Sequence, residues 1–167
     1  SSVTTGIVIR TPASDGDFIN LTVSNTSIRA NNDGLNIRNQ YNAPLANAQA
    51  RVTLENVDIV AGLGGAGHGV YANGPWNGSA VRATAGKVSS ITSSNGCGVY
   101  LTSVYLSAAS ATFDKTVIQG CGSHGIHLDT ALPNYSVTGS NQVKAVLTHC
   151  TIADNGGDGL HMVSLTS

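Results

Sequence analysis

Apolar and polar residues along the chain repeat a short pattern, in which a glycine is followed by an aliphatic, a variable and a second aliphatic residue. The pattern recurs about every 27 to 35 residues. Its opening residues are Gly6, Gly34, Gly69, Gly98, Gly125 and Gly159. That period is typical of solenoid proteins, in which each repeat stacks on the next. The unequal intervals indicate that loops of different length separate strands of constant length.

A second alternating segment precedes each glycine pattern. In this segment aliphatic or small residues alternate with polar ones, as in a strand with one buried face. The clearest copies are 23–28, 54–59, 113–118 and 147–152, with a weaker copy near 86–91. No segment sustains the i, i+3, i+4, i+7 spacing of an amphipathic helix. Turn-rich links join the two strands, and we expect their Gly and Asn residues to supply positive φ. These links include 30–33, 93–96 and 153–157.

Two short strands per repeat, without a helix, predict an all-β parallel solenoid in which each strand pairs with its copy one repeat later. Residues 56–72, 115–129 and 150–162 resemble the repeats of right-handed parallel β-helices in the pectin-lyase-like superfamily. The resemblance covers residues 6–162 and implies about five coils with no substantial helix. A β-sandwich is the alternative, because one sequence does not separate parallel from antiparallel pairing.

The 167 residues predict a single β-helix domain over 1–167. The glycine pattern stands near both ends of this sequence, and neither end resembles the capping elements that solenoids use. We therefore expect a segment of a longer chain or a unit that stacks on its neighbours. A complete domain with open ends is the alternative.

Composition and charge narrow the classes of function. Only 10% of the residues are charged and the net charge is -1. The 8 Lys and Arg residues are scattered, which argues against a nucleic-acid partner. No apolar run approaches the roughly 18 residues that span a membrane. Richness in Ser, Thr and Asn favours an extracellular or cell-surface protein.

Three cysteines, Cys97, Cys121 and Cys150, fit no zinc motif. One interpretation is that they are small buried residues at corners of the fold. The other is a disulfide between Cys97 and Cys121 in neighbouring repeats. From the sequence we expect neither a metal ion nor a cofactor.

Equivalent positions of a solenoid stack into columns about 4.8 Å apart. The aliphatic residues of the pattern are expected to point inwards: Leu35, Ile37, Val70, Val99, Leu101, Ile126, Leu128, Leu160 and Met162. The first outward column is then Val8, Asn36, Tyr71, Tyr100, His127 and His161. The second outward column is Arg10, Arg38, Asn73, Thr102, Asp129 and Val163. The turn column, just before the glycine, is Thr5, Asp33, His68, Cys97, His124 and Asp158.

Aromatic residues and histidines gather in these columns. Long connections after the pattern add Tyr41, Trp76 and Tyr135 along one edge, where solenoids frequently bind ligands. Aromatic faces beside hydrogen-bonding groups suit sugar rings. We predict that a polysaccharide or cell-surface glycan contacts Tyr71, Trp76, Tyr100, His161 and Arg38. A tyrosine column is also a stabilising cross-strand ladder that needs no ligand.

The resemblance to pectin-lyase-like repeats implies that, if the chain is an enzyme, it is a polysaccharide lyase or a glycoside hydrolase. Residues 31–34 and 67–69 resemble polygalacturonase signatures, but the required Asp pair and basic motif are missing, so no role is transferred from them. His127 with Asp129, on one face, is the best candidate for a general base. A solvated polar stripe is the alternative. A metal site built from His127, His161 and Asp129 is disfavoured, because flat columns rarely converge three ligands.

The sequence thus predicts an extracellular or surface β-helix that recognises or processes polysaccharide. The alternative is a structural segment of an adhesin, phage spike or filament that stacks through open ends. A stand-alone enzyme is disfavoured, since hydrolysis requires two converging carboxylates and the chain has only 9 acidic residues.

Overall fold

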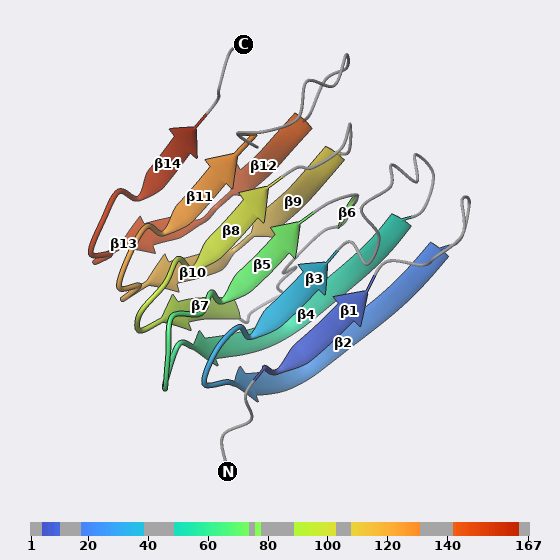
Figure 1. Cartoon of the computed structure of the whole chain (residues 1–167), viewed down its shortest axis with the longest axis horizontal. Coiled ribbons are helices and arrows are strands. Elements are labelled where there is room, and N and C mark those ends of the chain that lie inside the picture. The colour runs from blue at the N-terminus through green and yellow to red at the C-terminus, as the bar shows by residue number, and fades with distance from the viewer. Residues whose placement is uncertain are drawn as a thin grey trace.

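The computed structural model describes residues 5–10, 18–38, 49–73, 76–77, 89–102, 108–130 and 142–163. Within these residues every regular element is a β-strand, and the strands form two sheets that face each other (Figure 1). The first sheet contains β1 (Ile7–Arg10), β3 (Leu35–Arg38), β5 (Val70–Asn73), β8 (Val99–Thr102), β11 (Ile126–Asp129) and β14 (Leu160–Val163). The second contains β2 (Phe18–Arg29), β4 (Gln49–Ala61), β6 (Trp76–Asn77), β7 (Ser89–Ser93), β9 (Ala108–Asp114), β10 (Thr116–Gln119), β12 (Gln142–Thr148) and β13 (Thr151–Ala153).

The strands pair in parallel with their copies one repeat away. In the first sheet Leu35 pairs with Ile7 on one side and with Val70 on the other. In the second sheet Ile91 of the weakest sequence copy pairs with Ile59 and Ile118. The chain is therefore a parallel β-solenoid, and the β-sandwich alternative is wrong. Among the described residues no helix is long and apolar enough to cross a membrane.

The solenoid has about three full turns, fewer than the five coils expected from the sequence. Within the described chain, three coils have neighbours on both sides in both sheets: β4 with β5, β6 and β7 with β8, and β9 and β10 with β11. The first and last repeats form the ends of the stack. The glycine pattern therefore counts repeats, but it does not separate enclosed coils from end rungs.

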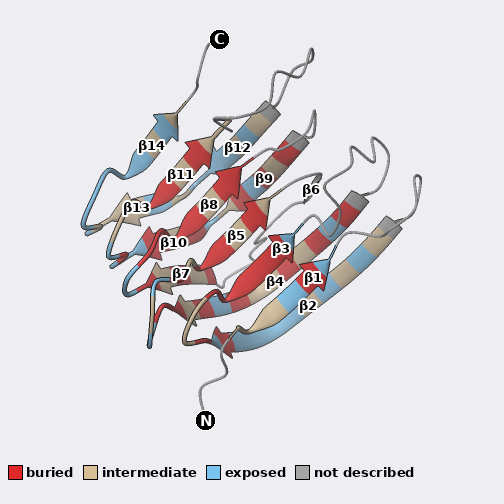
Figure 2. Ribbon diagram, viewed as in Figure 1, coloured by how far each residue is buried: buried red, intermediate tan, exposed pale blue. Residues whose placement is uncertain are grey.

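Inward-facing aliphatic residues fill the space between the two sheets. The buried members of the expected set are Leu35, Ile37, Val70, Val99, Leu101, Ile126 and Leu128. Leu160 and Met162 pair in register with the buried Ile126 and Leu128, but they are themselves 46% and 70% exposed. Only β11 pairs with β14, so no described strand covers these two side chains (Figure 2).

The glycine that opens each pattern is required by lack of space. A Cβ atom built at Gly98 would lie 2.5 Å from Cγ2 of Ile118 and 2.8 Å from the carbonyl oxygen of Gly125. Both of these neighbours belong to the following coil. At Gly159 the one close atom from the described part of the chain is Cγ2 of Ile152, at 3.4 Å. Close stacking of coils therefore explains the recurrence of glycine.

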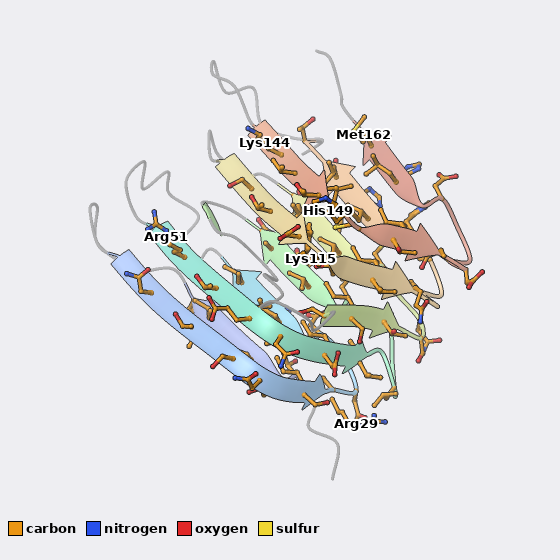
Figure 3. The ribbon with its side chains drawn as sticks, turned by 180° about the vertical axis from the view of Figure 1, so that it is seen from behind. Arg29, Arg51, Lys115, Lys144, His149 and Met162 are labelled. Atoms are coloured by element: carbon orange, nitrogen blue, oxygen red, sulfur yellow. The ribbon has the colours of Figure 1, made fainter. Side chains whose placement is uncertain are left out.

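A bend with positive φ interrupts the strands of the second sheet. It falls at Asn25, Asn56, Lys115 and His149, with φ of 50°, 53°, 48° and 52°. Nδ2 of Asn56 donates a hydrogen bond of 2.7 Å to Oδ1 of Asn25, so the bend stacks from coil to coil. Lys115 and His149 lie on the same sheet, seen from behind in Figure 3.

Positive φ in the links falls at fewer positions than the sequence suggested. It occurs at Gly62, Gly120 and Asp154, each directly after a strand of the second sheet. The links 30–33 and 93–96 contain no positive φ, so the expectation for them was wrong. Their Gly and Asn residues serve close packing and hydrogen bonding between coils instead. For example, a Cβ at Gly96 would lie 2.0 Å from the carbonyl oxygen of Gly67.

Candidate functional site

The first outward column is a continuous row across the first sheet. Tyr71 pairs in register with Asn36 on one side and with Tyr100 on the other. His127 pairs in the same way with Tyr100 and His161. The predicted columns are therefore confirmed as spatial neighbours.

Six rings form an unbroken series on this face, which we refer to as the ring array: His68, Tyr71, Tyr100, His124, His127 and His161. Neighbouring ring centroids lie between 4.2 and 5.7 Å apart. His68 and His124 enter the array from the turn column, whereas the other four belong to the first outward column. All six side chains are half-buried, so part of each ring remains open to solvent.

Backbone amides hold the turn-column side chains in place. Oδ1 of Asp33 accepts a hydrogen bond from the amide of His68 at 2.8 Å. Nδ1 of His68 accepts one from the amide of Cys97 at 3.1 Å, and Nδ1 of His124 accepts one from Asp158 at 3.0 Å. When neutral, both histidines therefore carry their proton on Nε2. Each contact joins one coil to the next.

Burial keeps two of the histidines neutral near pH 7. Desolvation lowers the pKa of His68 below 6.5, although the carboxylate of Asp33 opposes the shift. Desolvation also lowers the pKa of His127, and the neighbouring His161 adds to this effect. At these positions the array therefore presents neutral imidazole faces.

Tyr100 lies near the centre of the array. Its hydroxyl donates a hydrogen bond of 3.2 Å to Oδ2 of Asp129. Burial raises the pKa of Tyr100 to about 12, and the nearby Asp129 carboxylate contributes. The phenol is therefore neutral and fixed in orientation.

The predicted general-base pair, His127 and Asp129, lies on one face of β11. The carboxylate of Asp129 accepts the Tyr100 hydrogen bond. Nε2 of His127 is buried and has no hydrogen-bond partner among the described residues. A base acting through this atom would first have to become accessible, so the arrangement favours contact with a ligand over proton transfer.

Arg38 lies beyond the Tyr71 end of the array. Its Nε donates a hydrogen bond of 2.7 Å to Oδ1 of Asn36, and its Nη2 lies 4.0 Å from Oδ2 of Asp33. Asn36 also donates to Asp33 and is only 1% exposed, although its column faces outwards. The Arg38 guanidinium remains mostly exposed and is available to a ligand.

Trp76 is not brought into the array by its backbone. The residue lies in β6 of the second sheet, where it pairs with Ala50 and Ala109. Its side chain lies outside the described residues, as do Tyr41 and Tyr135. The predicted contribution of these three aromatics stays a prediction.

His124, Asp158 and His161 could hold a metal ion. One donor atom from each lies within 4.8 Å of the others, and in the described part of the chain they form the one such group of three. The sequence analysis expected no metal ion, and the one set of ligands that it weighed and disfavoured was His127, His161 and Asp129. His68, His124 and Asp158 all belong to the turn column, so the sequence does group them. Strand alternation does not predict which way a turn residue points, so the sequence did not identify these residues as part of the site.

The cysteines do not contribute to this surface. Cys97, Cys121 and Cys150 are free thiols, the first two of them buried. Burial raises the pKa of Cys121. The interpretation as small buried residues is therefore confirmed for Cys97 and Cys121.

Comparison of the chain with protein families, curated proteins and solved structures found no match. The functional interpretation therefore depends on the ring array and the groups around it. These groups supply ring faces, a neutral phenol, an exposed guanidinium and carboxylates.

Proposed function

We propose that the chain is a secreted or cell-surface β-helix that recognises or processes polysaccharide through the ring array. The unbroken series of six rings on one face carries the proposal. Partly open ring faces suit the C–H faces of sugars, and neighbouring polar groups suit their hydroxyls. The array crosses four strands of the first sheet, a span of about 14 Å at ordinary strand spacing, so it fits a polymer better than a single sugar.

The fold and the composition support the same proposal. A parallel β-solenoid is consistent with a right-handed β-helix of the pectin-lyase-like superfamily, to which we assign the chain as part of this proposal. Ser, Thr and Asn richness with few charges supports an extracellular or surface location. If the chain also cleaves its ligand, we propose His127 and Asp129 as the catalytic pair, with Nε2 of His127 becoming accessible when the ligand binds.

A glycan array, followed by affinity and depolymerisation measurements on the full chain, tests the proposal. Replacing both Tyr71 and Tyr100 with alanine should weaken binding about tenfold or more, since each ring loses its stacking contact. Thr112→Ala, at an exposed position of the second sheet, is the matched control and should bind as the original chain does. Absence of glycan binding and cleavage by the original chain would reject the proposal, as would full affinity in the double variant.

A second candidate function is a structural segment that stacks end to end with further copies. The exposed apolar side chains of Leu160 and Met162 favour this function. The residues at the same positions of the preceding coil, Ile126 and Leu128, are buried in the core. Such stacking is compatible with glycan binding on the first sheet, since the ring array faces away from the core.

A further inference from the structure

The turn before β14 brings together donor atoms from two adjacent coils. Nδ1 of His161 lies 2.7 Å from Oδ2 of Asp158. Nδ1 of His124, which comes from the turn before β11, lies 3.6 Å from the same oxygen. The rings of His124 and His161 stack with centroids 4.2 Å apart. Two imidazoles and one carboxylate therefore face a common point at the edge of the ring array.

We propose that His124, Asp158 and His161 bind a divalent transition-metal ion such as Zn²⁺. Two nitrogens and one oxygen are ligands that Zn²⁺, Co²⁺ and Ni²⁺ accept, and water completes the coordination. Neighbouring ligands of a tetrahedral zinc site are about 3.3 Å apart. The separations of 2.7 and 3.6 Å lie on either side of that value. Only small side-chain movements are needed.

Binding exchanges two existing hydrogen bonds for metal bonds. The ion takes the place of the proton between Nδ1 of His161 and Asp158, and the neutral imidazole then carries its proton on Nε2, exchanged through solvent. At His124 the ion displaces the amide of Asp158 from Nδ1. Asp158 is exposed, so this amide can bond to water instead. Asp158 is exposed and both histidines are half-buried, so the ion can enter from solvent.

The bound ion would act as a clamp between coils. His124 belongs to the coil of β11, whereas Asp158 and His161 belong to the last coil, which is largely exposed (Figure 2). An ion that binds only the folded stack stabilises it, and the stabilisation grows with the logarithm of the free ion concentration once this exceeds the dissociation constant. The site shares His124 and His161 with the ring array, so metal binding and glycan binding are measured separately.

Calorimetric titration of the chelator-treated full chain with ZnCl₂ tests the proposal, with the visible absorption of added Co²⁺ as a second readout. We expect one ion per chain. His161→Ala and Asp158→Asn should each weaken binding by about 10- to 100-fold or more. The matched control is His149→Ala, because His149 lies 3.3 Å from Asp114 in a pair that has no third donor in the described chain.

Thermal unfolding with and without Zn²⁺ separates a clamp from loose surface binding. Zn²⁺ should raise the melting temperature of the original chain and of His149→Ala, but not that of His124→Ala. Circular dichroism establishes that each variant is folded. Absence of stoichiometric binding by the original chain overturns the proposal, as does unchanged affinity in folded His161→Ala or an equal loss in His149→Ala.

Discussion

At the scale of single residues, His68 links the ring array to the stability of the coil stack. Its Nδ1 accepts the amide of Cys97, and burial lowers its pKa below 6.5. The folded chain therefore takes up this proton less readily than the unfolded chain. Stability should be fully present above pH 6.5 and fall as the pH drops through the lowered pKa. Urea unfolding at pH 8, 6 and 5 measures this loss.

His68→Asn is the variant that tests the origin of the pH dependence. The side-chain oxygen of asparagine can accept a hydrogen bond from the amide of Cys97, and asparagine does not titrate. Oδ1 of Asn155 accepts such a hydrogen bond from the amide of Cys121 at 3.1 Å. We expect the variant to lose less stability than the original chain between pH 8 and 5. His149→Asn, which leaves His68 intact, should keep the original dependence. An equal acid-side loss in His68→Asn would show that the pH dependence arises elsewhere.

Residue-level prediction succeeded where strand alternation applies. The period of two placed Tyr71, Tyr100, His127 and His161 in one row, and the register confirms this row. It could not orient His124, because a turn residue follows no fixed alternation and its direction depends on a hydrogen bond from the next coil. The alternation also does not show which outward residues are covered by their neighbours, as Asn36 is.

At the scale of elements, the bend of the second sheet offers a test of backbone strain. Lys115 adopts φ of 48° at the position where two other coils have asparagine. Left-handed backbone is costly for most side chains and less so for asparagine. Lys115→Asn should therefore raise the free energy of unfolding by about 0.5 to 1 kcal/mol. Chemical denaturation measures it.

Lys144→Asn is the control for this change, because Lys144 is an exposed residue within β12. Figure 3 shows both lysines on the second sheet. Asparagine is unfavourable in strands, so this variant should gain no stability. A loss of stability in Lys115→Asn would indicate that the lysine side chain makes a contribution larger than the backbone cost.

The glycines that open each coil provide a second test at this scale. Gly98→Ala places a Cβ against Ile118 and Gly125, and should lower the free energy of unfolding by about 1 to 3 kcal/mol. In Gly159→Ala the new Cβ lies 3.4 Å from Ile152, its one close neighbour in the described chain. This variant should change the free energy of unfolding by less than about 0.5 kcal/mol. Thermal or urea unfolding of the two variants checks the contrast. Equal effects would mean that the glycine serves the turn rather than the stacking of coils.

At the scale of the whole molecule, repetition made the architecture predictable. A glycine followed by alternating aliphatics fixes the strand, its register and its buried face in every repeat at once. The exposure of the last coil could not be predicted for the same reason. The sequence pattern at Leu160 and Met162 matches the pattern at the buried Ile126 and Leu128. Burial of a coil depends on whether another coil lies beyond it, and the sequence of the repeat does not contain that information.

The exposed end of the stack should mediate association between copies. Leu160 and Met162 present apolar surface beside β14, whose outer edge has no partner strand in the described chain. An apolar face beside an open strand edge favours addition of further strands, and lysine on such an edge opposes it. We therefore expect the molar mass, measured by light scattering, to rise with protein concentration. Replacing Leu160 and Met162 together with lysine should abolish this rise.

Replacing Thr112 and Gln119 together with lysine is the matched control, because both are exposed residues on β9 and β10, which have partner strands on both sides. This variant should associate as the original chain does, since it adds the same two positive charges away from both ends of the stack. A constant monomer mass for the original chain would contradict association through the exposed end. So would unchanged association in the double lysine variant, which would place the contact on another surface. Because the ring array lies on a different face, glycan affinity should be the same in associated and monomeric protein.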